Sequence, residues 1–155
     1  MALTDTQIST LRSVVLAEPS LTSAVNTGND LAIMIWCNTI VPTYKVWNTT
    51  TPASVVGDAI TWANLTPTDI PDATTLYTNR ALFAQAKQLN IQIYLQGREF
   101  LSTNKPNIRA GLQDALTNLP TGPSGNLLSG GWANVKNVIQ RAATNAEKVL
   151  AVGTG

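Results

Sequence analysis

Residues 129–155 read SGGWANVKNVIQRAATNAEKVLAVGTG, and this closing stretch decides how the fold is interpreted. Its apolar residues recur at i, i+3, i+4 and i+7 spacing, which is typical of one face of an α-helix. They are Trp132, Val135, Val138, Ile139, Ala142, Ala146, Val149 and Leu150. The pattern predicts a single helix of about six turns that begins after two glycines, with Ser129 as its cap. Residues 151–155 carry only small side chains, so we expect a flexible C-terminal tail.

Length and composition indicate one helical domain over residues 1–150. A chain of 155 residues, 44% of them hydrophobic, is long enough to bury a core of its own. Only 12% of the residues are charged and the formal net charge is +1. Such a surface gives little electrostatic repulsion between copies. It suits a subunit covered by neighbours, although an ordinary neutral domain is an equally good interpretation of the composition alone.

The same numbers argue against several functions. Ten basic residues are balanced by nine acidic ones, without a basic stripe for nucleic-acid phosphates. The chain has no histidine, which removes the commonest general base and metal ligand. The single cysteine, Cys37, lies in an apolar run that is interpreted as a buried helix, so no disulfide is expected. We therefore expect no enzyme activity, no cofactor and no metal site.

The chain also lacks the signals that address a protein to a membrane. The N-terminus has no basic segment followed by a long apolar run, as a signal peptide would. The longest apolar run, around residues 31–37, is too short to span a bilayer. The expectation is a protein made in the cytoplasm, with no membrane partner.

Cap and breaker residues predict most of the helices. Thr4 and Gln7 have capping-box spacing before the first helix, and Pro19 follows its end. Asn29 or Asp30 is placed to cap a second helix over residues 31–40. A short helix is expected at 53–59, a long one from 72 or 74 to 101, and a fourth from Ile108 to Pro120.

Residues 41–71 are expected to form an irregular loop that contains proline and tryptophan. Within it, Tyr44 to Trp47 is predicted to be a short extended stretch. Long loops of this kind are usually functional or lie at an interface. The predicted fold class is therefore all-α: four or five helices around one core, with the loop 41–71 and the flexible tail attached.

Groups capable of chemistry are sparse. Asp69 and Asp72 are close in sequence, but Asp72 is best explained as a helix cap. Arg109 lies near a predicted helix N-terminus, where it could hold an anion or bridge an interface. Tryptophan, tyrosine and arginine are enriched at interface hot spots, although each tryptophan is also a good core residue.

Four stretches of the chain resemble a family of small virion proteins of tailed bacteriophages. The opening Ala2-Leu3-Thr4 to Leu21 is similar to the family's N-terminus, and Asn38 to Thr49 resembles its Asn-x-x-x-x-Pro-x-aromatic-x-Val-Trp-Arg-Thr pattern. Asn107-Ile108-Arg109-Ala110-Gly111 and the segment Ala142 to Gly155 are also similar. Asn48 stands where the pattern has arginine.

The resemblance implies a structural role in the phage particle, as a head-to-tail connector or adaptor on the portal. Its partners would be copies of itself, in a ring of about twelve by analogy, together with portal and tail proteins. The protein would then be located in the virion. The alternatives are another virion role, at the tail end or on the capsid, and a monomeric host-directed binding module.

In such a ring, one subunit's loop or tail would dock on the next. The residues expected at this contact are Tyr44, Trp47, Trp62, Arg109, Arg141, Ala151, Val152, Gly153, Thr154 and Gly155.

Overall fold

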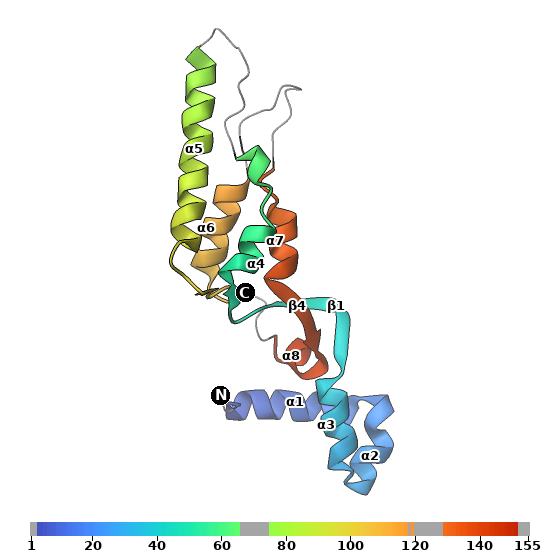
Figure 1. The fold of residues 1–155 in the computed structure, drawn as a ribbon. Coiled ribbons are helices and arrows are strands. Elements are labelled where there is room, and N and C mark those ends of the chain that lie inside the picture. The colour runs from blue at the N-terminus through green and yellow to red at the C-terminus, as the bar shows by residue number, and fades with distance from the viewer. Residues whose placement is uncertain (1–2, 66–74, 118, 120–128, 152–155) are drawn as a thin grey trace. The chain divides into compact units, whose positions relative to one another are not determined.

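A computed structural model describes residues 3–65, 75–117, 119 and 129–151, with the side chains of 75–81 left out of the description (Figure 1). The elements are α1 (Asp5–Ala17), η1 (Pro19–Leu21), α2 (Thr22–Thr27), α3 (Asp30–Asn38), β1 (Ile40–Trp47), β2 (Thr51–Pro52), α4 (Ala53–Asp58), η2 (Trp62–Asn64), α5 (Thr75–Leu95), β3 (Phe100–Leu101), α6 (Pro106–Leu116), α7 (Trp132–Val138), β4 (Gln140–Thr144) and α8 (Asn145–Val149). The predicted all-α class is wrong. The fold is helix-rich but mixed α/β, with the two-stranded sheets β1–β4 and β2–β3.

The chain divides into two compact units. Unit 1 consists of Met1–Trp47 and Arg141–Gly155, and unit 2 consists of Asn48–Gln140. The chain therefore crosses between the units twice. Compactness does not decide whether two units unfold together, so the single domain expected for residues 1–150 stays a prediction.

Helices α1 and α3 of unit 1 begin at the caps that the sequence predicts, and α3 ends at Asn38, two residues before the predicted end. The Thr4 amide donates to Gln7 Oε1 at 2.9 Å and the Gln7 amide donates to Thr4 Oγ1 at 3.3 Å, which completes the capping box. Gly28 ends α2 with φ +66°, a left-handed conformation that glycine adopts without a Cβ clash. Asn29 caps α3 by accepting from the Ala32 amide at 3.1 Å. The predicted capping box at Thr4 and the predicted cap at Asn29 are confirmed.

The single closing helix predicted from Ser129 to Leu150 is wrong. The structure forms α7, then strand β4, then α8. Thr144 caps α8 in an extended conformation (φ −82°, ψ 166°), which a residue inside a helix does not adopt. The helical spacing of the apolar residues was therefore overridden by a second capping box, Thr144 with Glu147, which sequence reasoning missed.

Strand β4 pairs with β1 in unit 1. The Asn145 amide donates to Thr39 O at 3.0 Å, and the Asn48 amide donates to Ile139 O at 2.9 Å. The residue after β4 is bonded to the residue before β1, and the residue after β1 is bonded to the residue before β4, so the two strands run antiparallel. Exposed Pro42 has no amide hydrogen to donate, which a strand with one neighbour tolerates.

The region expected to be an irregular loop, 41–71, is mostly regular where it is described. It contains most of β1, then β2, α4 and η2, while residues 66–71 lie outside the described part. The short helix after Pro52 is confirmed, although Pro52 is its cap rather than its first residue. Asp69 and Asp72 also lie outside the description.

Unit 2 packs α4, α5, α6 and α7 against one another. Its fully buried side chains include Val56, Leu65, Ile91, Leu101, Leu112, Leu116, Leu119, Val135 and Ile139. The long helix was predicted to run to Leu101, but α5 ends at Leu95. Gly97 follows with φ +68°, and Leu101 turns back to pair with Thr51 across β2–β3.

The contact between α5 and α6 depends on a glycine. A Cβ built on Gly111 would lie 1.9 Å from the Tyr94 hydroxyl oxygen and 2.6 Å from its Cζ atom. The Tyr94 ring can therefore lie against α6 in this position only because residue 111 has no side chain. This explains the glycine that ends the Asn107 to Gly111 motif.

Gly111→Ala is expected to destabilise the protein by about 1–3 kcal/mol, because Tyr94 or α6 must shift to admit the methyl group. The measurement is the free energy of unfolding in denaturant, followed by circular dichroism. Gly57→Ala in α4 is the matched control, since its Cβ would meet only Leu95 Cδ1 at 3.7 Å. If both substitutions change stability equally, the close approach is not the cause.

Candidate interface surfaces

The structure separates the residues predicted to form an interface into two groups. Tyr44 and Trp47 on β1, Arg141 on β4 and Ala151 after α8 belong to unit 1, whereas Trp62 on η2 and Arg109 on α6 belong to unit 2. Tyr44 and Trp47 are half-buried, while Arg141 and Ala151 are exposed. Residues 152–155 lie outside the described part, so their predicted role stays a prediction.

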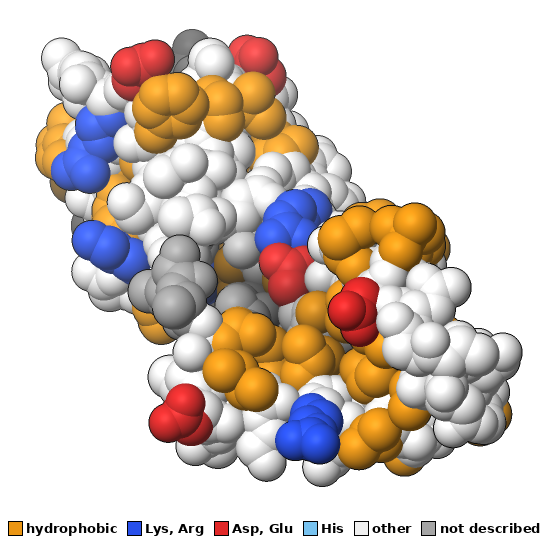
Figure 2. Space-filling model, turned by 90° about the horizontal axis from the view of Figure 1, so that it is seen from below, with side chains coloured by type: hydrophobic (Ala, Val, Ile, Leu, Met, Phe, Trp, Pro, Cys, Tyr) orange, Lys and Arg blue, Asp and Glu red, His pale blue; other side chains and the backbone are white. Residues whose placement is uncertain are grey.

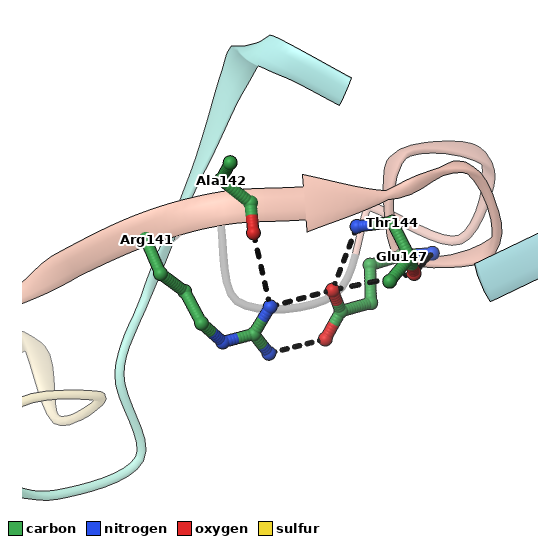
Figure 3. Close-up of polar contacts among 4 residues, drawn as sticks. All are labelled: Arg141, Ala142, Thr144 and Glu147. Carbon is green, nitrogen blue, oxygen red and sulfur yellow. Dashed lines mark hydrogen bonds and ion pairs between the residues drawn. The ribbon is translucent and has the colours of Figure 1, made fainter. Parts of the chain in front are cut away.

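Arg141 forms a bidentate ion pair with Glu147 (Figure 3). Its Nη1 donates to Glu147 Oε2 at 2.8 Å, its Nη2 donates to Oε1 at 2.5 Å, and Nη1 also reaches Ala142 O at 3.2 Å. The same carboxylate accepts from the Thr144 amide at 3.0 Å. One glutamate thus both caps α8 and ties α8 to β4. Arginine recognises carboxylates in this planar geometry.

The pair changes the acidity of both groups. The hydrogen bonds from Arg141, opposed by burial and helped by the Thr144 amide, lower the pKa of Glu147 from 4.5 to about 2. The carboxylate in turn raises the pKa of Arg141. The Glu147 side chain is 25% exposed and that of Arg141 50% exposed. Solvent screening therefore reduces the pair's contribution to about 1–2 kcal/mol.

Arg109 belongs to a buried polar network rather than to an open surface. It is 7% exposed, and its Nη1 donates to Thr103 O at 3.3 Å and Asn104 O at 2.7 Å. The Thr103 hydroxyl donates to Asn48 O at 2.8 Å and lies 3.0 Å from that of Thr51. Burial lowers the pKa of Arg109. The network fixes α6 against the β2–β3 sheet, so Arg109 has a structural role in unit 2.

Trp62 lies beside an open hollow of about 600 Å³ in unit 2. The hollow is lined by Ala53, Ser54, Gly57, Asp58, Trp62, Leu95 and Arg98. The Trp62 ring nitrogen donates to Gly57 O at 2.9 Å, and the residue is 37% exposed. Asp58 and Arg98 bring one charge of each sign to the lining, so the hollow selects no ionic ligand by charge.

Helix α3 presents an apolar stripe to solvent, although the sequence indicated a buried helix. Leu31, Met34 and Ile35 are 61%, 53% and 57% exposed, and they share one face of the helix. The opposite face, with Trp36 and Cys37, is only half-buried. Burial raises the pKa of the Cys37 thiol. Helices α2 and α8 contact α3, but a helix that is apolar all round is normally covered on every side, and the described residues leave the face with Leu31, Met34 and Ile35 exposed.

Helix α5 has two apolar faces. Ala84, Lys87 and Ile91 are buried, and Lys87 Nζ lies 3.1 Å from Asp114 Oδ2 of α6. Directly opposite, by helical geometry, is a second stripe made of Leu82, Ala86, Leu89 and Ile93. Its three large residues are 58%, 56% and 59% exposed. Among the described residues, this second stripe therefore remains exposed.

Figure 2 shows one face of the molecule, on which hydrophobic side chains lie in several patches with basic and acidic side chains between them. Sequence reasoning missed the α3 and α5 stripes as interface candidates, because periodicity marks apolar faces without showing which are covered. The signal that could have identified these stripes is that α3 and α5 each have more apolar positions than one buried face requires. Glu147 was also missed, although Thr144-x-x-Glu147 is a recognisable capping box.

In the part of the chain that the structure describes, no three acidic, cysteine or histidine side chains come together as a metal site would require. Nor does any described helix combine the length and apolarity needed to cross a membrane. The described surface does carry exposed hydrophobic areas on α3 and α5.

Arg141→Ala is expected to lower the free energy of unfolding by about 1–2 kcal/mol at pH 7. Because the folded pKa of Glu147 is depressed, the stabilisation is present above pH 4.5 and is lost as the pH falls towards 2. The difference between wild type and variant should therefore shrink across this window in denaturant titrations. Lys148→Ala, at an exposed position of α8, is the control. A difference independent of pH would contradict this account.

The chain has no match among protein-family models, curated proteins or solved structures.

Proposed function

We propose that the chain is a structural subunit of a tailed-phage particle, a head-to-tail connector that assembles as a ring on the portal. Two kinds of observation support this proposal. The first is that four stretches resembling the phage family occur along the chain from end to end, and together in their order they carry more weight than any one of them. The low charge of the chain and the exposed apolar stripes on α3 and α5 support a role as a subunit.

The observation that carries the proposal is the poor internal burial of unit 1. Its buried hydrophobic residues among those described are Val15, Leu21, Val46 and Ala143. Its exposed large hydrophobic residues are Leu3, Ile8, Leu16, Leu31, Met34, Ile35 and Ile40, each 44–61% exposed. Covering that exposed surface would release on the order of 5–10 kcal/mol. A gain of this size is comparable with the cost of association, so unit 1 is suited to being covered by a partner.

The alternative of a monomeric host-directed binder fits these surfaces less well. Such a module needs one exposed apolar patch for one target. Here exposed apolar stripes occur in both units, on α3 in unit 1 and on α5 in unit 2. Two separate stripes favour a subunit with more than one neighbour. Another virion position, at the tail end or on the capsid, would use the same surfaces and differ in its partners.

The proposal predicts that the purified chain binds the portal as a multimer. Mass photometry of the chain, of the candidate portal and of their mixture measures the mass of each species. The expected result is a portal complex carrying a closed ring of this chain. A chain that stays monomeric and does not bind the portal would overturn the connector function.

The contact residues predicted from the sequence are tested separately. Trp47→Ala combined with removal of residues 151–155 is expected to weaken assembly at least tenfold, while the fold is kept. Because Trp47 is half-buried, circular dichroism must first show an intact fold. Tyr77→Ala, outside this predicted set, serves as a control for the loss of an aromatic ring. Unchanged assembly of the combined variant would refute the contact role of these residues.

A further inference from the structure

We propose that unit 2 binds a neutral sugar in the open hollow beside Trp62. The hollow of about 600 Å³ is lined by residues of α4, η2 and the end of α5. A second hollow of about 510 Å³, lined by Trp62, Gln92, Leu95 and Gln96, shares Trp62 and Leu95 with the first. Both volumes are those of small-molecule sites. This site goes beyond the proposed connector function, and neither depends on the other.

The Trp62 ring offers a ligand an apolar surface. Its ring nitrogen donates to Gly57 O at 2.9 Å, and the residue is 37% exposed. An indole has one hydrogen-bond donor and no acceptor. Because that donor is bonded to α4, the exposed part of the ring meets a ligand through its carbon atoms. The same bond holds the ring in place, so a ligand with a flat apolar face finds the platform already formed.

Gly57 keeps α4 from filling the hollow. A glycine inside a helix is destabilising relative to alanine, and Gly57 is not among the described glycines with a positive φ. A Cβ at this position would meet only Leu95 Cδ1 at 3.7 Å, an ordinary contact, so packing does not require a glycine here. Its effect is that no side chain enters the hollow from this turn of α4, and a ligand can approach the backbone closely.

Polar side chains surround the ring. Ser54 and Asp58 come from α4, Gln92 from α5, and Gln96 and Arg98 follow α5; all five are exposed. Among the described residues, none of these five side chains makes a hydrogen bond or ion pair within the chain. The carboxylate accepts hydrogen bonds, the guanidinium donates them, and the amides and the hydroxyl do both. The lining therefore offers donors and acceptors around one apolar surface.

This combination fits a neutral sugar better than a charged ligand. Asp58 repels a phosphate and Arg98 repels a cation, so neither kind of ligand gains from the pair. Each sugar hydroxyl both donates and accepts, and can use the carboxylate, the guanidinium and the amides alike. The C–H face of a sugar ring packs on an aromatic ring. A stacked nucleic-acid base would bring phosphates that need a basic groove, which a single arginine opposed by an aspartate does not provide.

Titrations with cellotriose, maltotriose and tri-N-acetylchitotriose, followed by NMR of the indole N–H signals, test the site. At least one of these sugars is expected to bind with a dissociation constant of about 1 mM or less. The Trp62 signal should shift on binding, while the signal of Trp36 in unit 1 should not. The absence of a saturable shift with all three sugars would overturn the proposal.

Two variants locate the binding. Trp62→Ala removes the platform and Gly57→Leu fills the hollow, and each is expected to weaken binding at least tenfold. Trp62→Phe keeps an aromatic ring and should bind within a few-fold of wild type. Val55→Leu, at an exposed position of α4 outside the lining, is the control for Gly57→Leu. Circular dichroism must first show an intact fold, which is expected for Gly57→Leu because leucine is the better helix former.

The remaining outcomes each contradict one part of the proposal. Unchanged binding by Trp62→Ala and Gly57→Leu would show that the sugar binds elsewhere, and the site would be wrong. Tighter binding of glucose 6-phosphate than of all three neutral sugars would show an anion site, and the ligand class would be wrong. Neither outcome bears on the connector function, which is measured by assembly with the portal in the absence of sugar.

Discussion

The cap made by Thr144 and Glu147 is the constraint on which the C-terminal part of the fold depends. Thr144 must be extended to cap α8, and this conformation ends any helix that continues from α7. The segment before the cap is then free to form β4, which pairs with β1 and brings the C-terminal end into unit 1. Arg141 reinforces the arrangement, since it binds the same carboxylate from the strand side. A cap is typically worth about 1 kcal/mol, which is enough to decide between two local conformations of similar stability.

Local signals in the sequence predicted the elements whose ends are set by nearby residues. The Thr4 capping box and the Asn29 cap predicted the starts of α1 and α3, and the short helix expected at 53–59 is α4. The β2–β3 pairing was not predictable in this way, because Thr51 and Leu101 are fifty residues apart and each strand has only two residues. Exposure was the other missing information. Arg109 appeared suited to an interface but is buried in a polar network, whereas the apolar α3 appeared buried but has one exposed face.

The two units contribute differently to the proposed role. Unit 2 has a well-filled core, a buried polar network around Thr103 and a close helix contact at Gly111, so it provides a stable body. Unit 1 has few buried hydrophobic residues among those described and an exposed apolar stripe on α3, as a docking element would. A stable body with an incompletely covered docking element is typical of subunits that complete their burial on assembly. The low charge of the chain fits the same interpretation.

The central claim is that the exposed apolar stripes are contact surfaces between copies of this chain. Sedimentation velocity of the wild-type protein over a wide concentration range tests it most directly. The account predicts that the weight-average mass rises above 16.5 kDa with concentration and approaches a defined multiple of it. A mass of one chain at every concentration would contradict it.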